Sequence, residues 1–82
     1  MATVVLRNFA DLSRDNLRMR RVHGMLISYP GIDRFAFYVI ERERGYRIEF
    51  PNDTTHISSD MIARIEAIVG KENVIIEEIT FQ

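Results

Sequence analysis

The sequence predicts an α+β domain whose elements follow the order strand–helix–strand–strand–helix–strand. Three observations predict this order. Residues 28–31 combine proline and glycine between a helical pattern and an apolar run, and residues 68–74 make a second helix-to-strand turn around Gly70. Between these turns, two short apolar runs are separated by charged residues, which is typical of a hairpin. The chain therefore divides into two halves of similar organisation.

The first strand and the first helix are predicted by residue type and spacing. Residues 3–7 form a β-branched run. Asp11 and Ser13 are candidate N-caps for a helix that runs to about Tyr29. Pro30 cannot continue the helical hydrogen bonds, so the helix has to end before it. The stripe expected to be buried, at spacings of three and four, is Met19, Val22, Leu26 and Tyr29.

The middle of the chain predicts a β-hairpin. Residues 34–41 are almost all apolar, so both faces of this strand should be covered at least in part. Residues 42–45 form a charged loop in which Gly45 is suited to a positive φ. The following strand alternates, with three side chains expected to face the core: Tyr46, Ile48 and Phe50.

The second helix has a clear beginning and end. Ser58 is the expected N-cap, and Ile57 before it can pack on Ile62 as a hydrophobic staple. Gly70 is the expected stop. Residues 74–81 then predict the last strand. The buried stripe of this helix comprises Met61, Ile62, Ile65, Ile68 and Val69.

Two helical crossovers around a hairpin predict a ferredoxin-like βαββαβ sandwich. In that arrangement a four-stranded antiparallel sheet carries both helices on one face, and the other face is free. Residues 1–82 are expected to form a single domain. A core of this size supplies only about 3–5 kcal/mol, so support from a partner, a neighbouring domain or a weak homodimer is plausible.

Composition narrows the function classes. The net charge is −1, from 11 basic and 12 acidic residues. This balance does not favour nucleic acid as the principal partner, although a local basic patch would be compatible with contact. Cysteine is absent, which excludes disulfides and thiolate metal sites and fits a cytoplasmic protein. No apolar run has the roughly 18 residues that a membrane span needs, and no signal peptide is recognisable.

No set of residues predicts catalysis, a cofactor or a metal. His23 and His56 lack companions at metal-ligand spacing. His23 is expected on the polar side of its helix as a plain surface residue, and His56 in a loop. Ser58 and Ser59 are more simply explained by a helix cap than by nucleophilic chemistry. The carboxylates are expected in solvated hairpin and strand positions rather than in the apolar pocket that acid–base catalysis requires.

The first helix carries the residues that most resemble a binding surface. Arg14, Arg18 and Arg21 share one face, because they are spaced by four and three residues. A solvated face is the simpler interpretation, and an acidic partner or a nucleic-acid backbone is the functional one. Leu17 and Ile27 lie outside the buried stripe, and exposed apolar residues framed by arginines are typical of protein contacts. We therefore expect a partner-binding site at Leu17, Arg18, Arg21 and Ile27.

Several segments together resemble a known family. They are residues 4–6, 26–31, 35–39, 46–50, 57–59 and 65–74. In this order they are similar to the extreme C-terminal domain of the bacterial DNA polymerase III α subunit, a C-family replicative polymerase. The resemblance covers almost the whole chain, and consists of hydrophobic spacing with Pro30, Gly31 and Gly70 at its turns.

The resemblance implies that the chain is a C-terminal fragment of a longer polymerase. The polymerising carboxylates would then lie upstream. This domain would be non-catalytic and would bind replisome proteins, foremost the clamp-loader τ subunit, during DNA replication. The alternative is a standalone ferredoxin-like domain that binds RNA or a small ligand. Residues 44–50 faintly echo the aromatic strand motif with which RNA-recognition domains stack bases.

Overall fold

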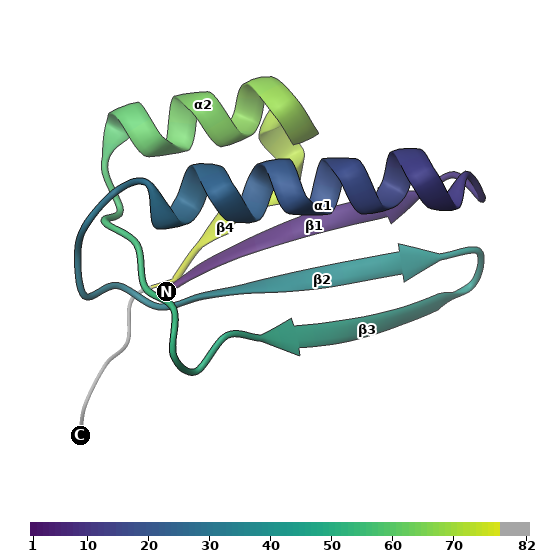
Figure 1. Cartoon of the computed structure of the whole chain (residues 1–82), viewed down its shortest axis with the longest axis horizontal. Helices are drawn as coiled ribbons and strands as arrows, with labels where there is room; N and C mark the ends of the chain where they lie inside the picture. The colour runs from purple at the N-terminus through teal and green to yellow at the C-terminus, as the bar shows by residue number, and fades with distance from the viewer. Residues whose placement is uncertain (78–82) are drawn as a thin grey trace.

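The computed structural model describes residues 1–77. Its strands are β1 (Ala2–Asn8), β2 (Phe35–Glu41), β3 (Arg44–Glu49) and β4 (Val74–Ile76), as Figure 1 shows. The helices are α1 (Leu12–Ile27), α2 (Ser59–Val69) and the short 3₁₀ helix η1 (Lys71–Asn73). The predicted order of elements is thus confirmed. The last strand was expected to reach Phe81, and residues 78–82 lie outside the described part of the chain.

The sheet is mixed, so the expected antiparallel sheet is wrong. The strand order is β3-β2-β1-β4. β1 and β2 are parallel neighbours, with Val4 beside Phe37, while β3 pairs antiparallel with β2 and β4 antiparallel with β1. The ferredoxin-like order, in which another strand separates the two strands of the first βαβ unit, is not observed. Periodicity predicts which residues form strands, but it does not specify which strand lies beside which.

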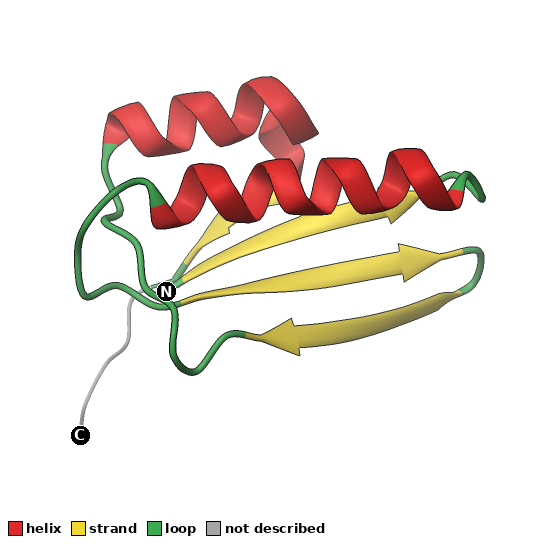
Figure 2. Ribbon diagram, in the orientation of Figure 1, coloured by secondary structure: helices red, strands yellow, loops and turns green. Residues whose placement is uncertain are grey.

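Both helices cover the same face of the sheet (Figure 2). Alternate residues of β1 and β2 point to this face. These residues are almost fully buried: Ala2, Val4, Leu6, Phe35, Phe37 and Val39. Val22 and Leu26 of α1 pack on them together with Met61 and Ile65 of α2. One continuous core therefore joins the first βαβ unit to α2.

The predicted ends of the helices are largely confirmed. The Asp11 side chain accepts a hydrogen bond from the amide of Arg14, so Asp11 rather than Ser13 caps α1. Ser58 caps α2 by accepting from the amide of Met61. Gly70 ends α2 with a φ of 95°, a conformation that favours glycine. Each of these caps and stops depends on residues within one helical turn, which is why the helix ends could be predicted from the sequence.

The hairpin differs from the prediction in one detail. Its turn comprises only Arg42 and Glu43, and Arg42 has the positive φ, 54°. Gly45 lies inside β3 and is not among the described residues with positive φ. A Cβ atom at Gly45 would come within 2.3 Å of the Tyr38 hydroxyl oxygen. A side chain at this position would therefore require the Tyr38 ring to move.

Candidate docking surface

A groove opens between α1 and the end of α2. It is lined by Arg14, Leu17, Arg18 and Arg21 of α1, by Ala67 and Ile68 of α2, and by Phe9, Asp11 and Asp15. We call this the α1–α2 groove. Leu17 is 68% exposed and Phe9 is 74% exposed, so the groove presents apolar side chains to solvent. Leu17, Arg18 and Arg21, three of the predicted partner-binding residues, thus lie together.

The groove has an excess of positive charge. Three of its residues are arginines, and two are aspartates. Within residues 1–77, none of these arginines lies within ion-pair distance of a carboxylate. The two aspartates are already engaged, because Asp11 caps α1 and Asp15 accepts from the amide of Phe9 at 3.2 Å through both oxygens. Both carboxylates keep their charge in these bonds, so an anionic group entering the groove would meet an excess of one positive charge.

Arg18 lines the groove and contacts Phe9 and the end of β1. Its guanidinium lies 5.4 Å from the centre of the Phe9 ring and donates a hydrogen bond through Nη2 to the carbonyl oxygen of Arg7. Its Nε atom is buried and has no hydrogen-bond partner among the described residues. Arg18 therefore connects α1 to the end of β1, with one donor left unsatisfied.

Ile27, the fourth predicted residue, does not line the groove. It is 47% exposed near the end of α1. Ten residues separate it from Leu17, which is about 15 Å along a helix axis. Phe9 and Ile68 are groove residues that the sequence reasoning missed. Phe9, a large aromatic between a strand and a helix cap, offered a signal, whereas Ile68 was expected to be wholly part of the core.

A second hollow lies on the other side of Phe9. It is formed by the beginning of α1 and the β2–β3 turn, and its wall includes Leu12 and Met19. Charges of both signs line it: Asp15, Glu41, Arg42, Glu43 and Arg44. Three acidic and two basic residues line this hollow, so its charge is opposite in sign to that of the α1–α2 groove, where three basic residues face two acidic ones.

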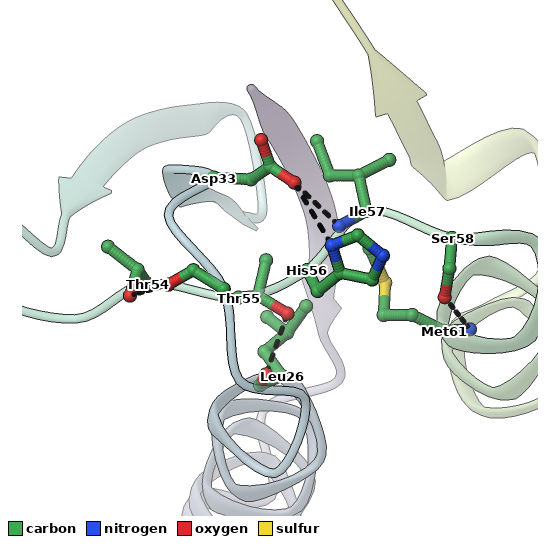
Figure 3. A network of polar contacts seen from close by, with 9 residues as sticks. Leu26, Asp33, Thr54, Thr55, His56, Ile57, Ser58 and Met61 are labelled. Carbon is green, nitrogen blue, oxygen red and sulfur yellow. Dashed lines mark hydrogen bonds and ion pairs between the residues drawn. The ribbon is translucent and has the colours of Figure 1, made fainter.

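A polar network joins the end of α1 to the beginning of α2 (Figure 3). The buried hydroxyl of Thr55 donates to the carbonyl oxygen of Leu26 at 2.7 Å. Asp33 exchanges two backbone hydrogen bonds with Thr55, and its carboxylate accepts from the amide of Ile57 at 2.8 Å. These bonds satisfy backbone groups at the ends of two helices, so the network has a structural role.

This network brings together serine, histidine and aspartate, but not in a catalytic arrangement. Nδ1 of His56 lies 3.9 Å from Asp33, which is an ion-pair distance and too long for a hydrogen bond. The hydroxyl of Ser58 accepts from the helix amide of Met61. No hydrogen bond between Ser58 and His56 is found in residues 1–77. The serine therefore lacks the adjacent base that would activate it.

His23 is not the plain surface residue that the sequence suggested. Its ring is half-buried, with centroid distances of 5.0 Å to Phe50 and 5.9 Å to Phe35. Nε2 lies 3.0 Å from the Asp53 carboxylate. Because Phe50 and Asp53 come from the segment after β3, they cover a histidine that helical spacing alone would leave exposed.

The tyrosines with altered acidity lie outside the α1–α2 groove. The Tyr29 hydroxyl donates to the Asp60 carboxylate at 2.7 Å, and this bond raises the pKa of Tyr29. Arg64 partly opposes the increase. Burial raises the pKa of Tyr46, and the nearby charge of Glu41 adds to the effect. Both phenols are therefore favoured in the neutral form.

Comparisons with known proteins find no matching family model, no similar curated protein and no similar solved structure. Among the described residues, neither helix combines the length and the apolar character of a membrane span. Residues 1–77 likewise contain no cluster of three or more potential metal ligands.

Proposed function

We propose that this chain is a non-catalytic docking domain of a bacterial DNA polymerase III α subunit and binds the clamp-loader τ subunit during DNA replication. The resemblance of residues 26–31, 46–50 and 65–74 supports the family. The α1–α2 groove supports the docking role. The observation that carries the proposal is that Leu17 is 68% exposed among arginines that have no ion-pair partner in the described residues.

The physical argument concerns what such a groove can bind. Exposed apolar side chains lower the free energy of association when a partner covers them. Arginine is enriched in protein interfaces, and its charge speeds encounter with an acidic partner. Leu17 and Ile68 would supply apolar contact, while Arg14 and Arg21 would select an acidic surface.

The experiment measures τ binding by surface plasmon resonance. Leu17→Asp should reduce affinity by at least about tenfold, because it removes apolar contact and places negative charge in the groove. Ile27→Asp is the matched control, since it makes the same kind of change on the same helix outside the groove. Both variants should keep the far-ultraviolet circular dichroism of the parent.

Salt and charge provide a second arm. Arg21→Glu should weaken τ binding, and the parent affinity should fall with rising salt. Absence of τ binding by the unmodified chain would refute the proposal. Equal affinity of the parent and Leu17→Asp would show that τ does not bind in the groove.

A second candidate function, binding of single-stranded RNA, is favoured by the other face of the sheet. Tyr38 is 40% exposed there and lies against Gly45, with Arg47 directly opposite on β3. Aromatic rings on a sheet stack bases, and neighbouring arginines contact phosphates. Ile48 and Phe50, from the aromatic motif noted in the sequence, pack on the core instead. A salt-sensitive gel shift that Tyr38→Ala abolishes would support this function over docking.

A further inference from the structure

β4 covers only part of the outer edge of β1. Its pairing extends from Ala2 to Val4, and β1 continues to Asn8. Met1 exchanges two hydrogen bonds with Glu77, and the amide of Ala2 bonds instead towards β2, to the carbonyl oxygen of Arg34. Because backbone groups alternate along a strand, the N–H and C=O groups of Arg7 also point to the outer edge.

Side chains of α1 take the place of a neighbouring strand at this part of the edge. Arg18 donates to the carbonyl oxygen of Arg7, and Asp15 accepts from the amide of Phe9. The amide of Arg7 precedes both covered groups on this edge, and no hydrogen bond to it from residues 1–77 is found on that side. An uncovered strand edge is a template for pairing with another chain.

The contact made by Arg18 is suited to displacement. Its buried Nε has no partner among residues 1–77, and an unsatisfied buried donor destabilises the arrangement that holds it. Rotation of Arg18 out of the groove would hydrate this atom and uncover the Arg7 carbonyl oxygen. The same rotation would leave an N–H and a C=O of one residue available to an incoming strand.

We propose that the partner binds as an extended, acidic polypeptide segment that adds a short strand to the outer edge of β1 at Arg7 and displaces Arg18. This inference rests on the proposed docking function, because it specifies the partner chemistry at the same groove. The charge argument is the guanidinium excess of Arg14, Arg18 and Arg21. A helical partner would not pair with the strand edge, and a cationic partner would not be attracted by this charge.

The strand geometry specifies a sequence pattern. Side chains of a strand alternate between the two faces of its sheet. On the helix-covered face, the added strand would meet Leu17 and Ile68 with Arg14 and Arg21 around them. Every second side chain of the added strand faces the groove, so the acidic and apolar residues of the partner should both occupy these positions. The side chains between them point to the other face, as in other cases of strand addition.

The test uses a phage-displayed library of random peptides, selected on the whole chain and counter-selected on Leu17→Asp. We expect enrichment of peptides in which acidic and apolar residues recur at alternate positions. NMR-detected hydrogen exchange should show that a selected synthetic peptide protects the amide of Arg7. Only every second amide of the added strand would point to β1. N-methylation of that set of peptide amides should abolish binding, and N-methylation of the other set should not.

Arg18→Met separates displacement from direct ion pairing. At high salt, where the loss of the Arg18 charge is screened, removal of the guanidinium should raise peptide affinity by about two- to tenfold, because the Arg7 carbonyl oxygen no longer has to be uncovered. Arg21→Met is the matched control and should lower affinity. The proposal would be overturned if no peptide is enriched or if the selected peptides leave the Arg7 amide unprotected. Weaker binding to Arg18→Met at high salt would also overturn it. Failure of τ to bind while such peptides do would refute the proposed function alone.

Discussion

Tyr38 lies against the backbone of Gly45, across the β2–β3 pair. A Cβ atom at Gly45 would stand 2.3 Å from the Tyr38 hydroxyl oxygen and 2.6 Å from Cζ. The two residues are diagonal neighbours on the face turned away from the helices, because Tyr38 pairs with Arg47 and Ile40 with Gly45. The missing side chain of the glycine makes room for the aromatic ring.

Gly45→Ala should destabilise the protein through this contact. The ring of Tyr38 would have to rotate into solvent, at a cost of about 1 kcal/mol. The same substitution in a Tyr38→Ala background should be neutral or slightly stabilising, since alanine restricts the unfolded chain more than glycine does. Urea unfolding of the four proteins in this double-mutant cycle measures the coupling. Additive effects would show that the two residues do not interact.

Thr55→Val should lower the free energy of unfolding by about 0.5–1.5 kcal/mol, because the Leu26 carbonyl oxygen still accepts from the amide of Tyr29 at 3.2 Å. The substitution preserves shape and leaves the buried carbonyl oxygen of Leu26 without its hydroxyl donor. Thr54→Val is the control, because Thr54 also donates to a carbonyl oxygen at 2.7 Å but is exposed to solvent. Its effect should stay within about 0.5 kcal/mol. Equal midpoints of chemical unfolding for the two variants would contradict the structural role of the buried bond.

Tyr29 should contribute an alkaline dependence of stability. The bond to Asp60 raises the pKa of Tyr29 above its unfolded value of about 10. A raised pKa means that the folded state favours the neutral phenol. The stabilisation is therefore fully present below the unfolded pKa and is lost as pH rises through the folded pKa. Asp60→Asn should shift the titration of the Tyr29 ring, followed by NMR, towards the ordinary value. A titration that does not move would exclude the bond as the cause.

Arg42→Asn should stabilise the hairpin by about 0.5–1 kcal/mol. Arg42 has a φ of 54°, and asparagine tolerates this conformation better than arginine does. Glu43→Asn is the control at the adjacent turn position, which is not among the described residues with positive φ. Thermal unfolding should give a higher midpoint for Arg42→Asn than for Glu43→Asn. A lower midpoint would indicate that the arginine makes a compensating contact.

Local signals in the sequence predicted the elements well. Pro30, Ser58 and Gly70 mark helix ends by chemistry that acts within one turn, and the structure places helix ends at or near each. The pairing of β1 with β2 depends on residues more than thirty positions apart. No local pattern encodes that choice, so a plausible but incorrect strand order was predicted.

The candidate site was predictable to the same extent. Leu17, Arg18 and Arg21 lie together because helical spacing brings them together. Phe9 reaches the groove through the turn before α1, and Ile68 reaches it through the packing of α2. Helical spacing within α1 reveals neither. Ile27 illustrates the opposite error, since exposure alone did not place it beside Leu17.

The pairing of Met1 with Glu77 allows the elements of the fold to be connected in a different order. Met1 donates to the carbonyl oxygen of Glu77 at 2.7 Å and accepts from its amide at 2.9 Å. A circular permutant can therefore join Glu77 to Met1 with a flexible linker and begin at Glu43 in the hairpin turn. All four strands would keep their neighbours, because an exposed tight turn is a tolerant place for new termini.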